Sequence, residues 1–347
     1  MKIKKIKLII VFIFVFLLSP FLTNNILALT ISPVRIEIRG NPGEIISGSM
    51  ELYNERDEIR KYYSSTANFE ARGEGGTPSF LSAKDGLALW IQAPESIILN
   101  PFERQEIQYT IQIPNNTEYG GYFAAIFWGT SPPAIEEQGQ AGEVAIGGKL
   151  GKLILLSVGD AEERGGIIEF SAEKGNFFTS LPINFIYRFS NDGNERINPI
   201  GDITIKNIFG LTSATINANI VEGNVLPGSI RKFNVFWHTR GQKIGDLTKM
   251  EEIDLRAQLT LNEDEKKGFF EIANEQWNNF AFGFYKAELN LVFGNNQKAE
   301  SLYRFFVIPW QLLSIIFIIL IILVFFIAIG IKKYNRWIIS KHVSREV

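Results

Sequence analysis

Histidine is scarce in this sequence, which limits the chemistry that the chain can perform. His342 lies near the C-terminal end, and His238 is the only histidine before the last apolar segment. A single histidine leaves one centre for a Ser-His-Asp arrangement and removes a His-rich metal site. No Gly-x-Ser-x-Gly, Walker-type or dinucleotide glycine motif accompanies it. We interpret His238 as a solvated or hydrogen-bonded residue at the end of a strand.

Acidic residues are the second group that could perform chemistry, because two carboxylates that converge across a cleft can cleave a glycosidic bond without leaving a sequence signature. The acidic runs Glu136-Glu137, Glu162-Glu163 and Glu263-Asp264-Glu265 lie in loop-like stretches, where solvated surface is expected. Asp57-Glu58 and Asp192 lack the spaced oxygen ligands of a calcium loop. The sequence therefore predicts a protein that is not an enzyme and needs no metal or cofactor, with an envelope hydrolase as an alternative.

Aromatic residues could form a sugar-binding surface, because their faces pack on the apolar face of a pyranose ring. The candidates are Tyr62, Tyr63, Trp90, Tyr119, Tyr122 and Trp128. Core packing is the competing interpretation, and it is favoured for Trp90 and Trp128. Tyr119 and Tyr122 flank the pair Gly120-Gly121, so we take these two tyrosines as the ligand-binding candidates.

Composition and charge exclude several classes of protein. The 347 residues are 46% hydrophobic, which is too apolar for disorder, and the absence of cysteine excludes disulfides and thiol chemistry. The formal charge is −2, but both ends are basic, so residues 8 to 331 carry about −10. An acidic middle disfavours nucleic acid as a partner.

The N-terminal residues 1–28 have the layout of a secretory signal peptide. A basic start precedes the apolar run Leu8 to Leu18, and Ser19-Pro20 follows. The sequence predicts cleavage between Ala28 and Leu29, with an uncleaved signal anchor as the alternative. Either outcome places residue 30 outside the cytoplasm.

A second apolar segment near the C-terminus predicts a membrane-spanning helix over residues 311–331. It contains no charged residue and is long enough to cross a hydrocarbon core of about 30 Å. Its predicted interface anchors are Trp310, Lys332, Lys333, Tyr334 and Trp337. The basic tail, residues 332–347, is expected in the cytoplasm. We therefore expect a single-pass protein of the cell membrane with its ectodomain outside; a buried core helix is the alternative for this segment.

The middle of the chain predicts an all-β fold. Apolar and polar residues alternate in many short runs, for example from Glu106 to Ile113, as in half-buried antiparallel strands. Turn residues separate these runs at the spacing of a β-sandwich. The segment from Phe269 to Phe280 fits either a short helix or an irregular loop.

The strands divide into two predicted immunoglobulin-like sandwiches, residues 29–160 and 166–308. The charged, Gly-closed stretch from Gly159 to Gly166 marks the boundary. The halves resemble each other, because Asn100-Pro101-Phe102-Glu103-Arg104 introduces an alternating strand as Leu226-Pro227-Gly228-Ser229-Ile230-Arg231 does. Residues near 240 to 280 are an insertion in the second half.

Several motifs resemble those of the WxL-interacting family of bacterial cell-surface proteins. They are Trp90-Ile91, Pro94, Leu99-Asn100-Pro101, Ile111-Gln112-Ile113-Pro114, Gly120-Gly121-Tyr122-Phe123 and Phe306-Val307-Ile308-Pro309-Trp310. The resemblance covers nearly the whole chain. It implies a first domain that binds peptidoglycan and a second that engages partner proteins.

The sequence thus predicts a membrane-anchored binding or scaffold protein of a bacterial cell envelope. Its expected partners are the membrane and either peptidoglycan or another cell-surface protein, through non-covalent contacts. The alternative is a structural module of a pilus, secretion or surface-layer assembly that pairs exposed strand edges with a partner.

Overall fold

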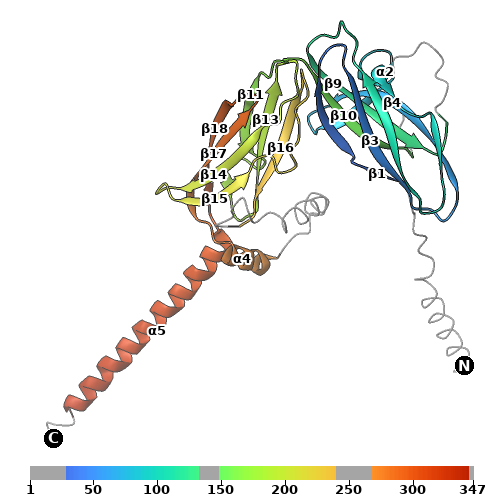
Figure 1. Ribbon diagram of the computed structural model, residues 1–347. Coiled ribbons are helices and arrows are strands. Elements are labelled where there is room, and N and C mark those ends of the chain that lie inside the picture. The colour runs from blue at the N-terminus through green and yellow to red at the C-terminus, as the bar shows by residue number, and fades with distance from the viewer. Residues whose placement is uncertain (1–28, 133–147, 240–267, 344–347) are drawn as a thin grey trace, which may run out of the picture. The chain divides into compact units, whose positions relative to one another are not determined.

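The computed structural model describes residues 29–132, 148–239 and 268–343 of the chain (Figure 1). These residues form two compact units. Of the described residues, the first unit contains those up to Glu70 and those from Ser79 to Gly159, and the second contains Ala71–Pro78 and those from Asp160 onward. Each unit has its own apolar core, in which Trp128 and Trp237 are fully buried.

The first unit is a sandwich of two β-sheets. One sheet has the strand order β1 (Leu29–Ser32), β3 (Ile45–Asn54), β8 (Arg104–Gln112), β6 (Ile91–Gln92). The other has the order β2 (Arg35–Gly40), β10 (Leu150–Val158), β9 (Gly120–Gly129), β4 (Arg60–Arg72), β5 (Thr77–Leu81), and β7 (Ser96–Leu99) pairs with β4. The short helix α2 (Leu87–Trp90) follows β5.

The second unit repeats this architecture with fewer strands. Its smaller sheet has the order β11 (Gly165–Ala172), β13 (Ile183–Asn191), β16 (Ile230–Trp237). Its larger sheet has the order β12 (Phe177–Phe178), β18 (Gln297–Val307), β17 (Gly283–Phe293), β14 (Ile200–Asn207), β15 (Thr212–Asn217). The predicted fold class is confirmed: the chain is mostly β, in immunoglobulin-like sandwiches, with one apolar C-terminal helix.

Alternating burial explains why these segments are strands. In β8, Ile107, Tyr109 and Ile111 are buried, whereas Glu106 and Gln108 are exposed. A period of two places every second side chain on one face of a sheet. The apolar face therefore turns into the sandwich, and the polar face meets water.

The two units share their strand order. The order β2-β10-β9-β4-β5 in the first unit matches β12-β18-β17-β14-β15 in the second, and β1-β3-β8 matches β11-β13-β16. In both larger sheets the first strand of this order is parallel to its neighbour, as β2 is to β10 and β12 to β18. These parallel pairs differ from the antiparallel sheets that the sequence predicts, because a local pattern does not show the direction of an edge strand's partner.

The two units also share the hydrogen bonds of a buried asparagine, which lies at the end of β3 in the first unit and at the end of β13 in the second. The side chain of Asn54 donates to the carbonyl oxygen of Glu58, and Asn191 donates to that of Glu195, in each case four residues ahead. The backbone nitrogens of Asn54 and Asn191 donate to Glu103 and to Ser229, which close the two Pro-containing turns.

Those two turns have one backbone conformation in common. Phe102 and Gly228 each follow a proline and have φ angles of 57° and 65°. A positive φ at the third turn position defines a type II turn, which glycine adopts without the steric cost that Phe102 bears. The likeness of the two motifs in the sequence thus reflects the same turn in each unit.

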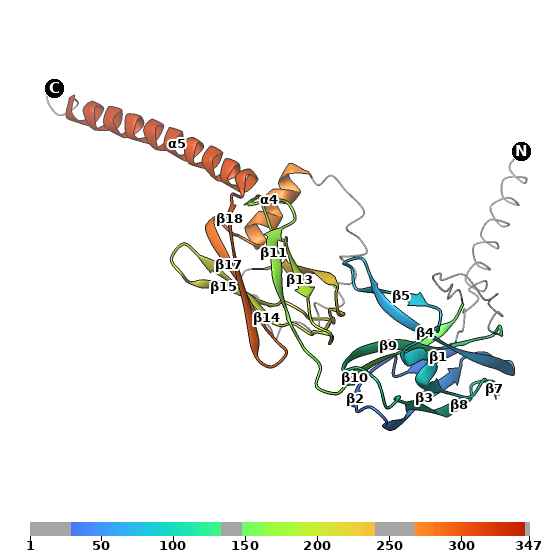
Figure 2. The same ribbon diagram turned by 90° about the horizontal axis from the view of Figure 1, so that it is seen from above.

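The connection between β16 and β17 is where the second unit departs most from the first. In the first unit, β8 ends at Gln112 and β9 begins at Gly120, whereas the second unit places residues 238–282 between β16 and β17. Helix α4 (Phe269–Asn278) forms the last part of this connection and packs beside the start of α5 (Trp310–Val343), as both views show (Figures 1 and 2).

Helix α5 is long and apolar enough to cross a membrane. Trp310 and Trp337 bound this segment, and at 1.5 Å per residue they are about 40 Å apart. That length matches a bilayer of roughly 40–45 Å that includes its headgroups.

Candidate functional site

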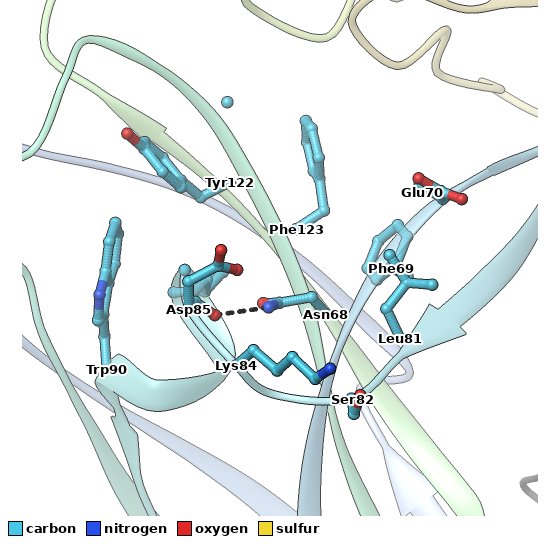
Figure 3. Close-up of a pocket in the computed structure, with 13 residues that line it drawn as sticks. Asn68, Phe69, Glu70, Leu81, Ser82, Lys84, Asp85, Trp90, Tyr122 and Phe123 are labelled. Atoms are coloured by element: carbon cyan, nitrogen blue, oxygen red, sulfur yellow. Dashed lines mark hydrogen bonds between the residues drawn. The ribbon is translucent and has the colours of Figure 1, made fainter. Parts of the chain in front are cut away.

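An open cleft of about 850 Å³ in the first unit is the candidate site. It lies between the end of β4, the segment that leads from β5 into α2, and the beginning of β9. Its lining residues include Asn68, Phe69, Leu81, Lys84, Asp85, Trp90, Tyr122 and Phe123. Figure 3 shows the rings of Trp90 and Tyr122 on one side of the cleft and Phe69 and Leu81 on the other.

Trp90 and Tyr122 form the aromatic wall. Their ring centroids are 4.7 Å apart and the ring planes are inclined by 50°. Both side chains are partly buried and pack against the core from one edge, so each also has a part that faces the cleft. Trp90 therefore packs against the core, as the sequence favours, and also lines the cleft.

The polar residue Asn68 holds the segment before α2 against β4. Its Nδ2 donates to the carbonyl oxygen of Asp85 at 2.6 Å, and its Oδ1 accepts from the backbone nitrogen of Ala88 at 2.9 Å. Gly86, with a φ of 70°, gives the chain the left-handed turn that brings both groups to Asn68. These bonds fix the position of Trp90 at the end of the four-residue helix.

Charged side chains surround the opening of the cleft. Glu70, Lys84 and Asp85 are exposed, and Figure 3 shows the Asp85 carboxylate between Trp90 on one side and Phe69 on the other, with the Lys84 chain below it. A mixture of one cation and two carboxylates offers hydrogen bonds to hydroxyl and amide groups and favours no strongly charged ligand. With the aromatic wall, this lining suits an uncharged polar molecule with an apolar face.

Tyr122 stays protonated over a wide pH range. Burial raises the pKa of its hydroxyl above the ordinary value, and the nearby Glu118 carboxylate raises it further. The hydroxyl donates to the backbone oxygen of Glu118 at 2.9 Å. The hydrogen bond holds the ring of Tyr122 in place at the edge of the cleft.

The other aromatic candidates lie elsewhere. Tyr62 and Trp128 are buried in the core of the first unit, where Tyr62 donates to Asn54 and Trp128 contacts the sulfur of Met50. Tyr119 is 56% exposed and is not among the residues that line the cleft; its ring lies against Gly159. The structure therefore brings Tyr122 together with Trp90 in the cleft lining, which does not include Tyr119.

The remaining predicted site residues lie away from the cleft or outside the described residues. Leu29 is the first residue of β1, and Ala28 lies outside the described residues. Trp310, Lys332, Lys333, Tyr334 and Trp337 are exposed on α5. His238 follows β16, where its ring stacks on Phe236 at 5.7 Å. The described residues contain no cluster of histidine, aspartate and glutamate that could hold a metal ion.

Asn68, Phe69 and Phe123 are site residues that the sequence analysis did not single out. Phe69 is buried and contacts Phe123 at 5.8 Å between ring centroids. Both occur in strands where an aromatic residue reads as core. The signal that could have identified the cleft is Asp85-Gly86, a turn pair directly before the apolar segment that carries Trp90.

No family model and no curated protein matches this chain. Among solved structures, the chain is similar to the class 5 fimbriae chaperone CfaA, with 13% identity and a TM-score of 0.35 over 80% of this chain and 98% of that one. It is similar to a chain of the Salmonella enterica SafA pilin–SafB chaperone complex, with 9% identity and a TM-score of 0.32 over 82% and 98%. The E. coli chaperone DraB gives 11% identity and a TM-score of 0.31 over 81% and 95%. TM-scores this low carry no argument about function, so the evidence for the function of this chain lies in its own residues.

Proposed function

We propose that this protein is a membrane-anchored binding protein of a bacterial cell envelope, whose first unit holds the glycan of peptidoglycan in the cleft beside Trp90 and Tyr122. The observation that supports this function most is the pairing of an aromatic wall with polar side chains in one open cleft. Aromatic rings stack on the apolar face of a sugar, while amide and carboxylate groups accept and donate hydrogen bonds at its edges. The resemblance to the WxL-interacting family supports the same ligand.

Membrane anchoring is part of this proposal and rests on α5. The helix has the length and composition of a membrane span, with aromatic residues at both margins and a basic stretch after the apolar one. The basic N-terminus of the chain predicts the same orientation, with the two β units outside the cytoplasm.

We also propose that binding is non-covalent and that the protein is not an enzyme. Tyr122 is held neutral, and the carboxylates around the cleft are exposed, which is not the environment that tunes a catalytic acid. Replacing His238, which lies in the other unit, with alanine should leave wall binding unchanged. Hydrolysis of wall material that this substitution abolished at unchanged stability would support the envelope-hydrolase alternative instead.

Co-sedimentation of the full-length protein, in detergent, with isolated cell wall tests the proposal. We expect Tyr122→Ala to weaken binding by about tenfold, the loss that a truncated aromatic contact of roughly 1.4 kcal/mol produces. Tyr119→Ala is the matched control, because Tyr119 is more exposed and lies outside the cleft lining. Equal binding by the two variants and the wild type would show that the cleft is not the glycan site.

A second candidate function is strand pairing with another surface protein, and the free edge of β15 favours it. Within the described residues, β15 is the last strand of the larger sheet in the second unit. The turn that leads into it exposes Ile208, Phe209 and Leu211, with Phe209 82% exposed. Edge strands next to apolar side chains bind extended peptides by sheet extension. Capture of a protein from an envelope lysate that Phe209→Ser abolishes, without any wall binding, would favour this function.

A further inference from the structure

The second unit exposes a set of aromatic side chains at the end from which α5 leaves. Each member is at least half exposed, and we name the set the aromatic collar: Phe177, Phe270, Trp277, Phe282, Phe284 and Trp310. Phe177, Phe282 and Phe284 gather around Phe306, and the nearest ring centroids, those of Phe284 and Phe306, are 4.4 Å apart. Phe306 lies four residues before Trp310 in the chain.

Helix α4 is locked to the first turn of α5 by one buried side chain. Gln276 is 2% exposed; its amide nitrogen donates to the side chain of Gln311 at 2.6 Å and to the backbone of Thr179 at 3.0 Å. Its amide oxygen accepts from the backbone nitrogen of Leu312 at 2.9 Å. The phenyl ring of Phe269 also contacts the Trp310 indole, with centroids 5.7 Å apart. A satisfied buried network of this kind fixes the position of the helix.

The faces of α4 are chemically distinct. Ala273 and Gln276 face the protein and are buried. Phe270 and Trp277 are seven residues apart, so they share a second face two turns long. Glu271 and Glu275, four residues apart, share a third face. Phe270 is 78% exposed and Trp277 65% exposed, although the Phe269 ring lies 5.5 Å from the Phe270 ring, and the acidic residues lie away from this face.

The collar lies at the level where the apolar part of α5 begins. Gln276 of α4 is bonded to Gln311 and Leu312, and the continuous apolar run of α5 starts at Leu312. Each headgroup layer of a bilayer is roughly 5–8 Å thick. Side chains of α4 next to Trp310 therefore reach this layer if α5 crosses the membrane. Trp rings prefer that layer, and Phe and Trp on the apolar face of an interfacial helix insert at its boundary with the acyl chains.

We propose that the aromatic collar docks the second unit onto the outer lipid surface, with Phe270 and Trp277 of α4 inserted into the headgroup layer beside the span. This inference rests on the membrane anchor of the proposed function and deepens it, because the second unit itself then contacts the lipid surface and is not only attached to it through α5. Helix α4 has two glutamates and no lysine or arginine, so apolar insertion and not attraction to anionic lipids holds it.

The absence of cysteine from the chain allows a direct test. Single cysteines that replace Phe270 or Trp277 carry an environment-sensitive fluorophore in the full-length protein, reconstituted in nanodiscs of neutral lipid. Lipids with a nitroxide in the headgroup region act as the quencher. Glu271→Cys and Asn278→Cys are matched controls on the same helix, and Lys298→Cys marks the opposite end of the β17–β18 hairpin.

We expect labels at 270 and 277 to be quenched strongly and labels at 271, 278 and 298 to be quenched weakly, with no change on adding salt. Phe325→Cys, inside the span, reports on the anchor itself and uses lipids with a quencher deep in the acyl chains. A quenched label at 325 with unquenched labels at 270 and 277 would overturn the docking proposal and leave the anchor intact. An unquenched label at 325 would overturn the anchor of the proposed function. Quenching at 277 that salt removes, or that needs anionic lipid, would also contradict docking by apolar insertion.

Discussion

Gly48 in β3 shows how one residue decides the packing of its neighbours. A Cβ atom at this position would come within 2.5 Å of the Tyr109 ring. That ring lies 5.0 Å from the Lys152 ammonium, which is fully buried and donates to the backbone oxygen of Ser49 at 2.7 Å. Burial lowers the pKa of Lys152 and raises that of Tyr109. Because Gly48 has no side chain, there is room for the Tyr109 ring, which lies beside the buried Lys152 ammonium.

Gly48→Ala should lower the free energy of unfolding of the first unit by about 1–3 kcal/mol, the usual cost of overpacking a filled core. Tyr109 is 3% exposed and cannot turn away from the added methyl group without displacing its neighbours. Gly166→Ala, in strand β11 of the second unit, is the control for a glycine-to-alanine change without overpacking, since no atom lies within 4 Å of a Cβ there. Urea unfolding followed by tryptophan fluorescence measures the difference; equal midpoints for both variants would refute this account.

At the residue scale, the sequence predicts which residues could contact a ligand better than it predicts which of them lie together. Tyr119 and Tyr122 are three positions apart and read alike, yet only Tyr122 lines the cleft with Trp90. Their separation depends on how β9 begins and on the bonds from Asn68 to the segment before α2. Those contacts join positions distant in the chain, and no local pattern records them.

Glu288 joins two neighbouring strands of the larger sheet in the second unit. Its carboxylate lies 2.6 Å from Lys206 on β14 and 2.5 Å from Lys286 on its own strand, β17. The hydrogen bond from Lys206 is the largest cause that lowers the pKa of Glu288, followed by the hydrogen bond from Lys286. The ionised form is therefore favoured in the folded state.

A lowered folded-state pKa makes stability fall with acidification. The contribution of Glu288 is present above the unfolded pKa of about 4.3 and is lost as pH falls through the folded value. Glu288→Gln should cost about 0.5–1 kcal/mol of unfolding free energy at pH 7, because the group is partly exposed, and almost nothing near pH 2. Urea titrations of the wild type and of Glu288→Gln across pH 2 to 7 measure the difference in unfolding free energy. A difference that increased on acidification would contradict the lowered pKa of Glu288.

Elements follow from the sequence where periodicity is strong. Alternation identified β8, β13 and β17, and the shared Pro-containing turn reflects the likeness of the two units. For the segment from Phe269 to Phe280, the sequence does not decide between a helix and a loop. One of the buried positions of α4 is the polar residue Gln276, and this interrupts the helical spacing of apolar residues. The direction of β2 and β12 could not be predicted, since it depends on partners far away in the chain.

The whole molecule is an arrangement of two β units and one apolar helix, and its predicted topology is testable on cells. Protease added to intact, wall-stripped cells should digest residues 30 to 308 and leave a short protected fragment with the C-terminus, because the charges at the two ends of the chain predict that only the basic tail lies inside. An antibody against the C-terminal tail detects the fragment. Protection of the full-length chain would contradict this topology.

Removal of the signal peptide is a second testable property of the whole molecule. Strand β1, Leu29–Ser32, pairs with the end of β3, and the sequence predicts cleavage directly before Leu29. Mass spectrometry of the mature protein should find Leu29 as the first residue. Detection of Met1 would favour the uncleaved signal anchor.

Titration of the full-length protein, held in nanodiscs, with soluble glycan strands released from peptidoglycan tests the central proposal most directly. The account predicts saturable binding with one site per chain, seen as heat in calorimetry, and a loss of about tenfold in affinity for Tyr122→Ala but not for Tyr119→Ala. Absence of binding by a folded wild-type protein, or equal affinities for all three proteins, would contradict a glycan site in the cleft of the first unit.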